Sequence, residues 1–336
     1  MRYFDKILNF LLPLIIGIEL LILVIGNNSP KEILLILQDV LKSPSNWILI
    51  ILSMSIGYLS EVLRGIRWKI LINPIGYKVK YIDLINSCAA GYMFNAVIPR
   101  SGELARCTML NKVSGVPITY LFGHVLIERV IDLIILLFCV LICIGYKWNI
   151  IYNYFYEHII ISNSLKSLLI YVLIIFIFLS FFSLFIRKKI SSNNSIKWIF
   201  KYLEKIKAGA LTIFNIKEKK MFVFYTLMIW FCYLFMTFIC FWCFKSMYQF
   251  NILDGLLIMT IGGIGMVIPT PGGMGSYHGA VFIGLHSLLN QSAEIATTFG
   301  FLVHGAQTTM IVIMGLIGFI MISVKKTYNL NKYERA

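Results

Sequence analysis

The chain has 336 residues, of which 59% are hydrophobic and only 13% are charged, and its formal net charge is +15. A soluble domain carries about 25% charged residues, so the composition excludes a soluble protein and predicts a polytopic helical membrane protein. The basic residues lie in loops between apolar stretches, which argues against a nucleic-acid-binding surface. The seven cysteines have apolar neighbours and no metal-ligand spacing, so we interpret them as buried thiols.

Six apolar stretches are long enough to cross a bilayer, which takes about 20 residues. They cover residues 7–25, 47–71, 124–144, 168–186, 221–244 and 296–324. Two shorter apolar segments, 83–98 and 253–269, each close on a proline and precede a short helix, at 102–112 and 276–289. We therefore predict an all-α fold with about six full spans and two re-entrant, broken hairpins. A β-barrel is not expected, because the alternation of apolar and polar residues that is typical of its strands is absent.

A short motif, V-I-P-x-x-G, occurs twice, at 97–102 and 267–272, and the two copies are 170 positions apart. Each copy interrupts an apolar segment at a matching place in one half of the chain. Such interruptions are the best sequence indication of the binding site in a transporter built from repeats. We therefore predict a single transmembrane domain, residues 1–336, made of two inverted halves at about 1–150 and 165–330.

The distribution of basic residues predicts the orientation. With Arg64, Arg67 and Lys69 at the basic end of the second stretch counted with the loop that follows, 21 Lys and Arg residues outside the spans and hairpins lie on one side and 5 on the other. The richer side is expected to be cytoplasmic. Both termini and a basic loop at 187–220 are then cytoplasmic, in a bacterial-type inner (plasma) membrane. Within that loop, apolar residues at helical spacing predict an amphipathic helix on the inner leaflet. Because each half has three full spans, the hairpins enter from opposite sides and their turns are expected to meet near mid-membrane.

The two turns are the candidate binding site, since irregular backbone at membrane depth is tolerated only where it is buried in protein or lines a wet cavity. Ser101 and Ser276 are expected to cap the helices that follow, and the free N–H groups at helix starts attract anions such as phosphate. Arg100 and Arg106 add positive charge in a geometry that matches phosphate, and Glu103 is spaced to pair with either of them. The alternative is a plain helical hairpin packed through small residues.

Charged residues within the apolar segments form a second candidate site. A charge at mid-membrane costs about 2.5–3.5 kcal/mol, so such residues usually face the bundle interior. Glu61 has a candidate partner in Arg64, whereas the simplest interpretation of Arg64 and Arg67 is that they extend to lipid head groups. These charged residues either pair with one another and so fix helix packing, or exchange partners with a lipid phosphate. The predicted intramembrane charge network comprises Glu61, Arg64, Glu128, Arg129 and Asp132.

Three groups of residues match the pattern of one known family. They are Asn95, Pro99, Gly102, Glu103 and Arg106, then Glu128, Arg129 and Asp132, and finally Pro269, Pro271, Gly272, Gly273 and Gly275. On these residues the chain resembles the lysylphosphatidylglycerol synthase transmembrane region, or flippase-like domain family, over nearly its full length. We expect a stand-alone member without the aminoacyl-transfer domain. Where the family often has Glu after the last glycine, this chain has Tyr277 and His278.

The resemblance implies a transporter that moves a lipid between leaflets, with an anionic phospholipid or a polyprenyl-phosphate-linked lipid as cargo. The alternatives are a membrane-embedded lipid-modifying enzyme, with Glu103 or His278 as acid or base, and an accessory subunit of a cell-envelope glycolipid pathway. The predicted head-group site comprises Asn95, Pro99, Arg100, Gly102, Glu103, Arg106, Pro269, Pro271, Gly272, Gly273, Gly275 and His278.

The expected partners are membrane lipids and, as candidates, enzymes of a cell-envelope lipid pathway, but no nucleic acid. The sequence contains no G-x-x-x-x-G-K-[ST], G-x-S-x-G or H-E-x-x-H motif. We therefore expect no cofactor, no metal ion and no use of ATP by the chain itself. This favours a transporter over an enzyme.

Overall fold

The structure is a computed structural model that describes residues 2–26, 29–156 and 197–325. These residues form helices joined by turns, and no strand occurs among them, which confirms the predicted all-α class. The predicted span at 168–186 and residues 187–196 of the basic loop lie outside the described residues.

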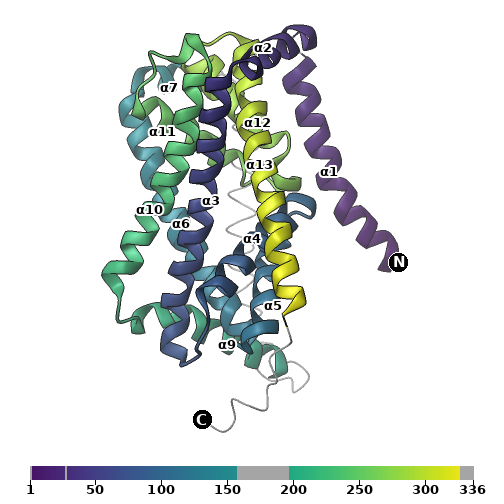
Figure 1. Ribbon diagram of the computed structural model, residues 1–336, viewed down its shortest axis with the longest axis vertical. Coiled ribbons are helices and arrows are strands. Elements are labelled where there is room, and N and C mark those ends of the chain that lie inside the picture. The colour runs from purple at the N-terminus through teal and green to yellow at the C-terminus, as the bar shows by residue number, and fades with distance from the viewer. Residues whose placement is uncertain (1, 27–28, 157–196, 326–336) are drawn as a thin grey trace.

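The helices are labelled as in Figure 1. They are α1 (Arg2–Gly26), α2 (Pro30–Lys42), α3 (Pro44–Ile72), α4 (Tyr81–Val97), α5 (Gly102–Ser114), α6 (Ile118–Tyr146), α7 (Trp148–Phe155), α9 (Lys197–Asn215), α10 (Lys219–Ile239), α11 (Ile252–Gly265), α12 (Ser276–Phe282) and α13 (Ala293–Val324). Short 3-10 turns occur at Asn73–Ile75, Cys240–Cys243, Lys245–Met247 and Pro271–Gly273, and a π-helical segment at Ile283–Leu288.

Local sequence explains several helix ends. Pro30 and Pro44 stand at the first position of α2 and α3, where the missing N–H has no helical partner to lose. Asn251 starts α11 with a capping box, because its side chain accepts from the Asp254 N–H while Asp254 accepts from the Asn251 N–H at 3.0 Å. Gly115 ends α5 with a left-handed φ of 72°.

Three helical stretches of the described chain are long and apolar enough to cross a membrane, at Pro44–Ile75, Lys219–Cys243 and Ala293–Val324. A fourth span results if Leu11–Gly26 and Pro30–Lys42, which meet at 90°, are counted as one. Long stretches of exposed apolar side chains on α3, α10 and α13 fit a surface that faces lipid. The protein is thus a multi-pass helical membrane protein, while the six spans and the inverted repeat stay predictions.

The two broken hairpins occupy opposite halves of the bundle. Figure 1 shows α4 and α5 in the lower half, at the end where α3 and α13 finish, and α11 and α12 in the upper half, next to α2 and α7. Their turns touch, since a Cβ placed on Gly272 would lie 3.3 Å from Cα of Ala96. The turns therefore meet as expected, while their place near mid-membrane stays a prediction.

Close helix packing holds this arrangement in place. α13 lies along α4, and its Gly318 leaves room for the backbone of Asn86, whose oxygen would be 2.7 Å from an added Cβ. α9 is helical as predicted and packs across the start of α6, where Gly123 faces Gly209 and Ala210. Its contact with the inner leaflet stays a prediction. All seven cysteines are buried, as expected.

Candidate functional site

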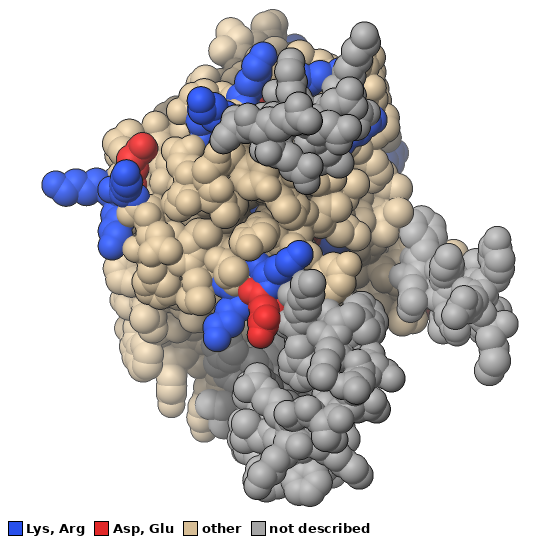
Figure 2. Space-filling model, turned by 90° about the horizontal axis from the view of Figure 1, so that it is seen from below, with Lys and Arg blue, Asp and Glu red and all other residues tan. Residues whose placement is uncertain are grey.

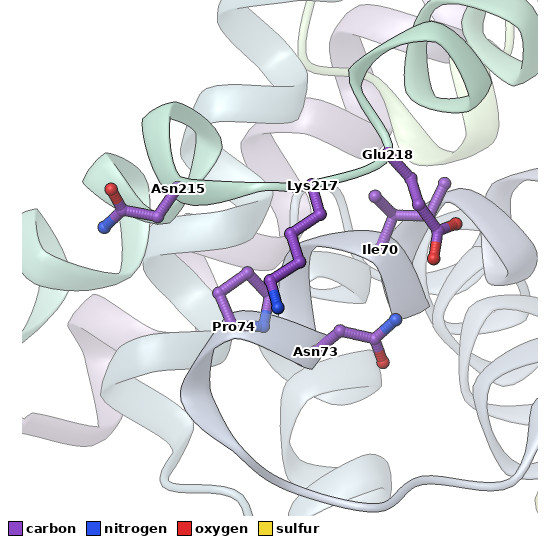
Figure 3. Close-up of a pocket in the computed structure, with 6 residues that line it drawn as sticks. All are labelled: Ile70, Asn73, Pro74, Asn215, Lys217 and Glu218. Carbon is purple, nitrogen blue, oxygen red and sulfur yellow. The ribbon is translucent and has the colours of Figure 1, made fainter.

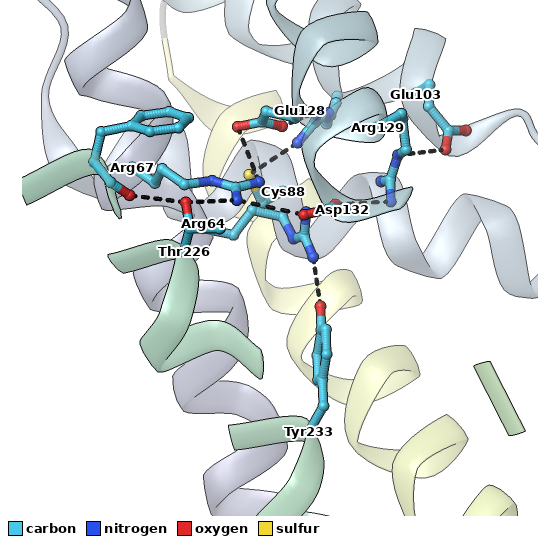
Figure 4. Close-up of polar contacts among 11 residues, drawn as sticks. Arg64, Arg67, Cys88, Glu103, Glu128, Arg129, Asp132, Thr226 and Tyr233 are labelled. Atoms are coloured by element: carbon cyan, nitrogen blue, oxygen red, sulfur yellow. Dashed lines mark hydrogen bonds and ion pairs between the residues drawn. The ribbon is translucent and has the colours of Figure 1, made fainter. Parts of the chain in front are cut away.

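A largely buried network of ion pairs joins α3, α5 and α6 (Figure 4). Glu128 of α6 pairs with two arginines, since Nη2 of Arg106 lies 2.5 Å from its Oε2 and Nη2 of Arg67 lies 3.6 Å from its Oε1. The guanidinium of Arg106 also lies over the ring of Trp68, at 4.7 Å from the centroid. Arginines from α3 and α5 thus meet on one carboxylate of α6.

Asp132, one helical turn further along α6, holds three arginines. Its oxygens lie 3.2 Å from Nη1 of Arg64, 3.4 Å from Nη1 of Arg67 and 3.6 Å from Nη1 of Arg129. Arg129 and Asp132, two members of the predicted network, are therefore in contact. α10 completes the network, since Arg64 donates to the hydroxyl of Tyr233 and Arg67 donates to Oγ1 of Thr226 at 3.1 Å (Figure 4).

Two expectations about the arginines of α3 were wrong. Arg64 and Arg67 do not extend to head groups, because they are only 1% and 0% exposed and are bound to Asp132. Arg64 is also not the ion-pair partner of Glu61, which belongs to no ion pair among the described residues and whose buried Oε2 accepts no hydrogen bond. Arg64 pairs with Asp132 on the neighbouring helix α6, and not with Glu61, which lies one turn away on its own helix.

Glu103 also has a partner other than the predicted ones. Its Oε1 lies 3.5 Å from Nε of Arg129 on α6, so the pairing with Arg100 or Arg106 was wrong. Arg129 is the least buried arginine of the network, with a side chain 40% exposed. Part of the head-group set therefore contacts the charge network directly.

These residues surround a narrow pocket between α4, α5 and α6. It has about 10 Å³ of free space, which is room for about one water molecule. The pocket is lined by Cys88, Gly91, Tyr92, Asn95, Gly102, Glu103, Arg106 and Arg129. Four predicted head-group residues, Asn95, Gly102, Glu103 and Arg106, thus share one pocket, which is too narrow for a phosphate in this conformation.

The first turn places Arg100 at the contact between the two hairpins. Pro99 and Arg100 connect α4 to α5, and Arg100 adopts a left-handed φ of 61°, which is uncommon for a residue other than Gly. Its side chain is exposed and donates from Nη2 to the carbonyl of Val267 in the second turn, at 3.5 Å. No ion pair among the described residues includes Arg100.

The cap of α5 comes from an unexpected residue. Oδ1 of Asn95 accepts from the N–H of Gly102 at 2.7 Å, whereas the hydroxyl of Ser101 donates to the carbonyls of Phe94 and Ile98. The prediction that Ser101 caps this helix was therefore wrong. A side chain from the preceding helix replaces it because α4 and α5 cross closely at Gly91 and Gly102.

The second turn is held by histidine and hydroxyl groups. Pro269 and Pro271 flank Thr270, whose hydroxyl lies 2.9 Å from the hydroxyl of Ser276. Ser276 is therefore occupied inside the turn and does not cap α12, contrary to expectation. Gly272, Gly273 and Gly275 all have left-handed φ angles, of 59°, 82° and 77°, which explains why glycine is needed at these three positions.

Two histidines, His278, which is buried, and His304, which is partly buried, fix the ends of this turn. Nδ1 of His278 accepts from the N–H of Gly275 at 3.3 Å, which caps α12. Nε2 of His304, on α13, lies 2.9 Å from the carbonyl of Gly272, and the two imidazole rings are 4.6 Å apart. His278 thus has a structural contact inside the predicted site.

A larger hollow lies at the lower end, where Lys and Arg side chains stand out from a mostly uncharged surface (Figure 2). It encloses about 210 Å³ between the end of α3 and the connection from α9 to α10 (Figure 3). It is lined by Ile70, Asn73, Pro74, Asn215, Lys217 and Glu218. Because Lys217 and Glu218 offset each other, this hollow has no excess charge for an anion.

Sequence reasoning missed Arg67, Thr226 and Tyr233 as members of the network. Arg67 lies three residues after Arg64, on the same face of α3, and this spacing was the available signal. Thr226 and Tyr233 lie more than 150 positions from their arginine partners, so no local pattern indicates them.

Comparison with known proteins agrees with the motifs. The family described as "Lysylphosphatidylglycerol synthase TM region" matches residues 10–315. The chain is 26% identical over 272 residues to a protein of Methanocaldococcus jannaschii named UPF0104 membrane protein MJ1595, and the match covers 74% of this chain and 76% of that protein. No solved structure matches the chain. With the motif residues gathered around both turns and the charge network, this match shows that the chain belongs to the lysylphosphatidylglycerol synthase TM region family.

Proposed function

We propose that this protein moves an anionic lipid, a phospholipid or a polyprenyl-phosphate-linked lipid, between bilayer leaflets, and that the head group binds where the two turns meet. The observation that carries the proposal is Arg100, whose exposed guanidinium stands at that contact without a carboxylate partner among the described residues. A charge within the membrane region is costly unless it is paired or hydrated. An anionic head group supplies the missing partner.

The backbone at Arg100 supports a role in binding. A non-glycine residue in the left-handed region costs about 1–2 kcal/mol, and such conformations are concentrated at functional sites. Here the conformation directs the side chain toward the second turn, where it contacts the carbonyl of Val267. A lipid phosphate that binds Arg100 would therefore lie against both hairpins at once.

The charge network offers a second group for the same anion. Four arginines and three carboxylates are joined by its ion pairs, which leaves one positive charge in excess. Arg129 is partly exposed and lines the pocket beside Glu103. We propose that the head group passes from Arg100 to Arg129 when the two turns separate.

The closed pocket implies a conformational change in this mechanism. Its 10 Å³ of free space cannot hold a phosphate, so the head group enters only after the turns part. The contacts described between the turns include the hydrogen bond of Arg100 and the packing of Gly272 on Ala96. Separation of the turns opens the site to one side of the membrane or to the other, as alternating access requires.

The test is a leaflet-exchange assay with purified protein in liposomes. Fluorescent phosphatidylglycerol reports exchange through a membrane-impermeant quencher, and fluorescent phosphatidylcholine serves as the zwitterionic comparison. Arg100→Asn removes the charge but retains a residue that tolerates left-handed backbone. We expect exchange of phosphatidylglycerol to fall at least about tenfold, which corresponds to about 1.4 kcal/mol.

Lys31→Gln is the matched control, because Lys31 is an exposed basic residue on α2, away from both turns. It should leave exchange unchanged. Equal exchange in Arg100→Asn and wild type would refute the assignment of Arg100 to the site. Exchange of neither lipid by folded wild-type protein would refute transport of these lipids.

We also propose the orientation that follows from the charge distribution. The lower end in Figure 1, seen face-on in Figure 2, holds the connection from α3 to α4, with Lys78 and Lys80, and the connection from α9 to α10, with Lys217. This end faces the cytoplasm of a cell with an inner (plasma) membrane. Enzymes that make or use the transported lipid in a cell-envelope pathway are the proposed protein partners.

A further inference from the structure

Glu61 on α3 is a buried carboxyl group that the network does not use. Its side chain is 6% exposed, Oε2 is buried and accepts no hydrogen bond, and none of the ion pairs found among the described residues includes it. An ionised carboxylate in such surroundings loses its hydration without gaining a partner, whereas the neutral acid loses far less. The geometry therefore favours a protonated Glu61 in this conformation.

The charged and titratable groups around Glu61 come from four helices. Those that interact electrostatically with it are Tyr58 and Arg64 on α3, Tyr92 on α4, Arg106 on α5 and Arg129 on α6. α13 also packs against α3, where the uncharged Gln307 lies over Gly57. All three arginines are already paired with Asp132, Glu128 or Glu103, and none of them forms an ion pair with Glu61 among the described residues.

Charge balance connects this carboxyl group to the anion. With Glu61 neutral, the network has one positive charge in excess, which matches the single negative charge of a phosphodiester. With Glu61 ionised, the same set of residues is neutral overall and has no excess charge for an anion. The carboxylate and a phosphate thus compete for the same arginines.

We propose that Glu61 is a proton-binding site coupled to the anion site. One proton binds with one anionic head group, and both are released when the site opens on the other side. Because the coupling is reciprocal, the anion favours protonation of Glu61 as much as the proton favours binding of the anion. A proton gradient then sets the direction of lipid movement. The coupling rests on the proposed function, but the protonation of Glu61 in the closed conformation does not.

Infrared spectroscopy tests the protonation without any lipid cargo. Purified protein in detergent at neutral pH should show the C=O stretch of a protonated carboxylic acid, identified by its shift in heavy water. We expect this band to be lost in Glu61→Gln and retained in Glu32→Gln, a matched change at an exposed glutamate on α2. Identical carboxylic-acid bands in Glu61→Gln and wild type would overturn the proposal.

Proton uptake tests the coupling. Short-chain phosphatidylglycerol is added to the protein in weakly buffered detergent solution with a pH indicator. Wild type should take up about one proton per lipid bound, and Glu61→Gln should bind the lipid without uptake. Equal uptake by both proteins overturns the coupling and leaves the transport proposal standing. If wild type binds no lipid, the transport proposal and the coupling fail together, while the infrared band still decides the state of Glu61.

Discussion

Nη2 of Arg106 on α5 lies 2.5 Å from Oε2 of Glu128 on α6, and both side chains are buried. This contact joins the first hairpin to a long helix of the bundle. Its strength depends on both partners, because a buried charge that loses its partner is far more costly than a buried pair. The network is therefore stable as a set and sensitive to single changes.

Substitution of Arg106 should show this sensitivity. Arg106→Met leaves Glu128 with Arg67 alone, at 3.6 Å, and we expect a loss of about 3–5 kcal/mol in the free energy of unfolding. The double variant with Glu128→Met should lose less than Arg106→Met, because no unpaired charge remains at that position. Thermal unfolding of the purified proteins in detergent measures the difference.

An exposed ion pair provides the comparison. Lys42 and Asp39 on α2 are 3.0 Å apart with side chains about three-quarters exposed, at 73% and 75%. Lys42→Met should change stability by at most about 1 kcal/mol. If Arg106→Met were as mild as Lys42→Met, the network would not support the fold as described.

The cap on α5 predicts a specific effect at Asn95. Asn95→Ala removes the acceptor for the Gly102 N–H and should destabilise the protein by about 1 kcal/mol. Asn95→Asp retains an acceptor oxygen and should lose less stability than Asn95→Ala. Hydrogen exchange of the first amides of α5 reports the loss directly. Unchanged protection at Gly102 in Asn95→Ala would contradict the assigned cap.

The crossing of α4 and α5 predicts a steric effect at Gly91. A Cβ at this position would lie 2.8 Å from the carbonyl oxygen of Gly102 and 2.9 Å from Cβ of Arg106. Gly91→Ala should therefore destabilise the hairpin by about 1–3 kcal/mol. Gly145→Ala is the control, because nothing lies within 4 Å of a Cβ there, and it should be neutral or slightly stabilising. Equal melting temperatures for the two variants would rule out this close crossing.

The contact between the turns is testable at Gly272. Both Gly272 and Gly76 have left-handed φ angles, of 59° and 82°, but only Gly272 has neighbours, with Ala96 at 3.3 Å from an added Cβ. Alanine at either position costs about 1–2 kcal/mol for the backbone conformation. Any further loss of stability in Gly272→Ala, measured by thermal unfolding, reports the contact with the first turn. A loss of stability no larger than in Gly76→Ala would show that this contact is weak.

Much of the secondary structure was predictable because it depends on local properties of the chain. The apolar lengths predicted the helices at 47–71, 221–244 and 296–324, and the prolines at 99 and 269 predicted the breaks in both hairpins. The meeting of the turns followed from the odd number of predicted spans in each half. The span at 168–186 lies outside the described residues.

Side-chain partners were predicted poorly where the choice was between helices. Local spacing suggested that Glu103 pairs with Arg100 or Arg106, but its partner is Arg129 on α6. Local spacing also suggested that Glu61 pairs with Arg64, but Arg64 pairs with Asp132 on α6. Likewise, spacing suggested serine caps, but Asn95 and His278 supply them. A pattern within one helix shows which residues share a face and does not show which other helix packs on that face.

The sequence by itself determined that this chain lies in a membrane, that two matching turns interrupt it, and that charged residues are buried with them. These properties follow from hydropathy, from the backbone limits of proline and glycine and from the cost of charge in lipid. The tertiary structure decided which charges pair, that Arg100 stands at the contact of the turns, and that Glu61 has no ion-pair partner in the described chain. Ion pairing depends on distances of a few ångströms between helices far apart in sequence, and only the packed bundle fixes those distances.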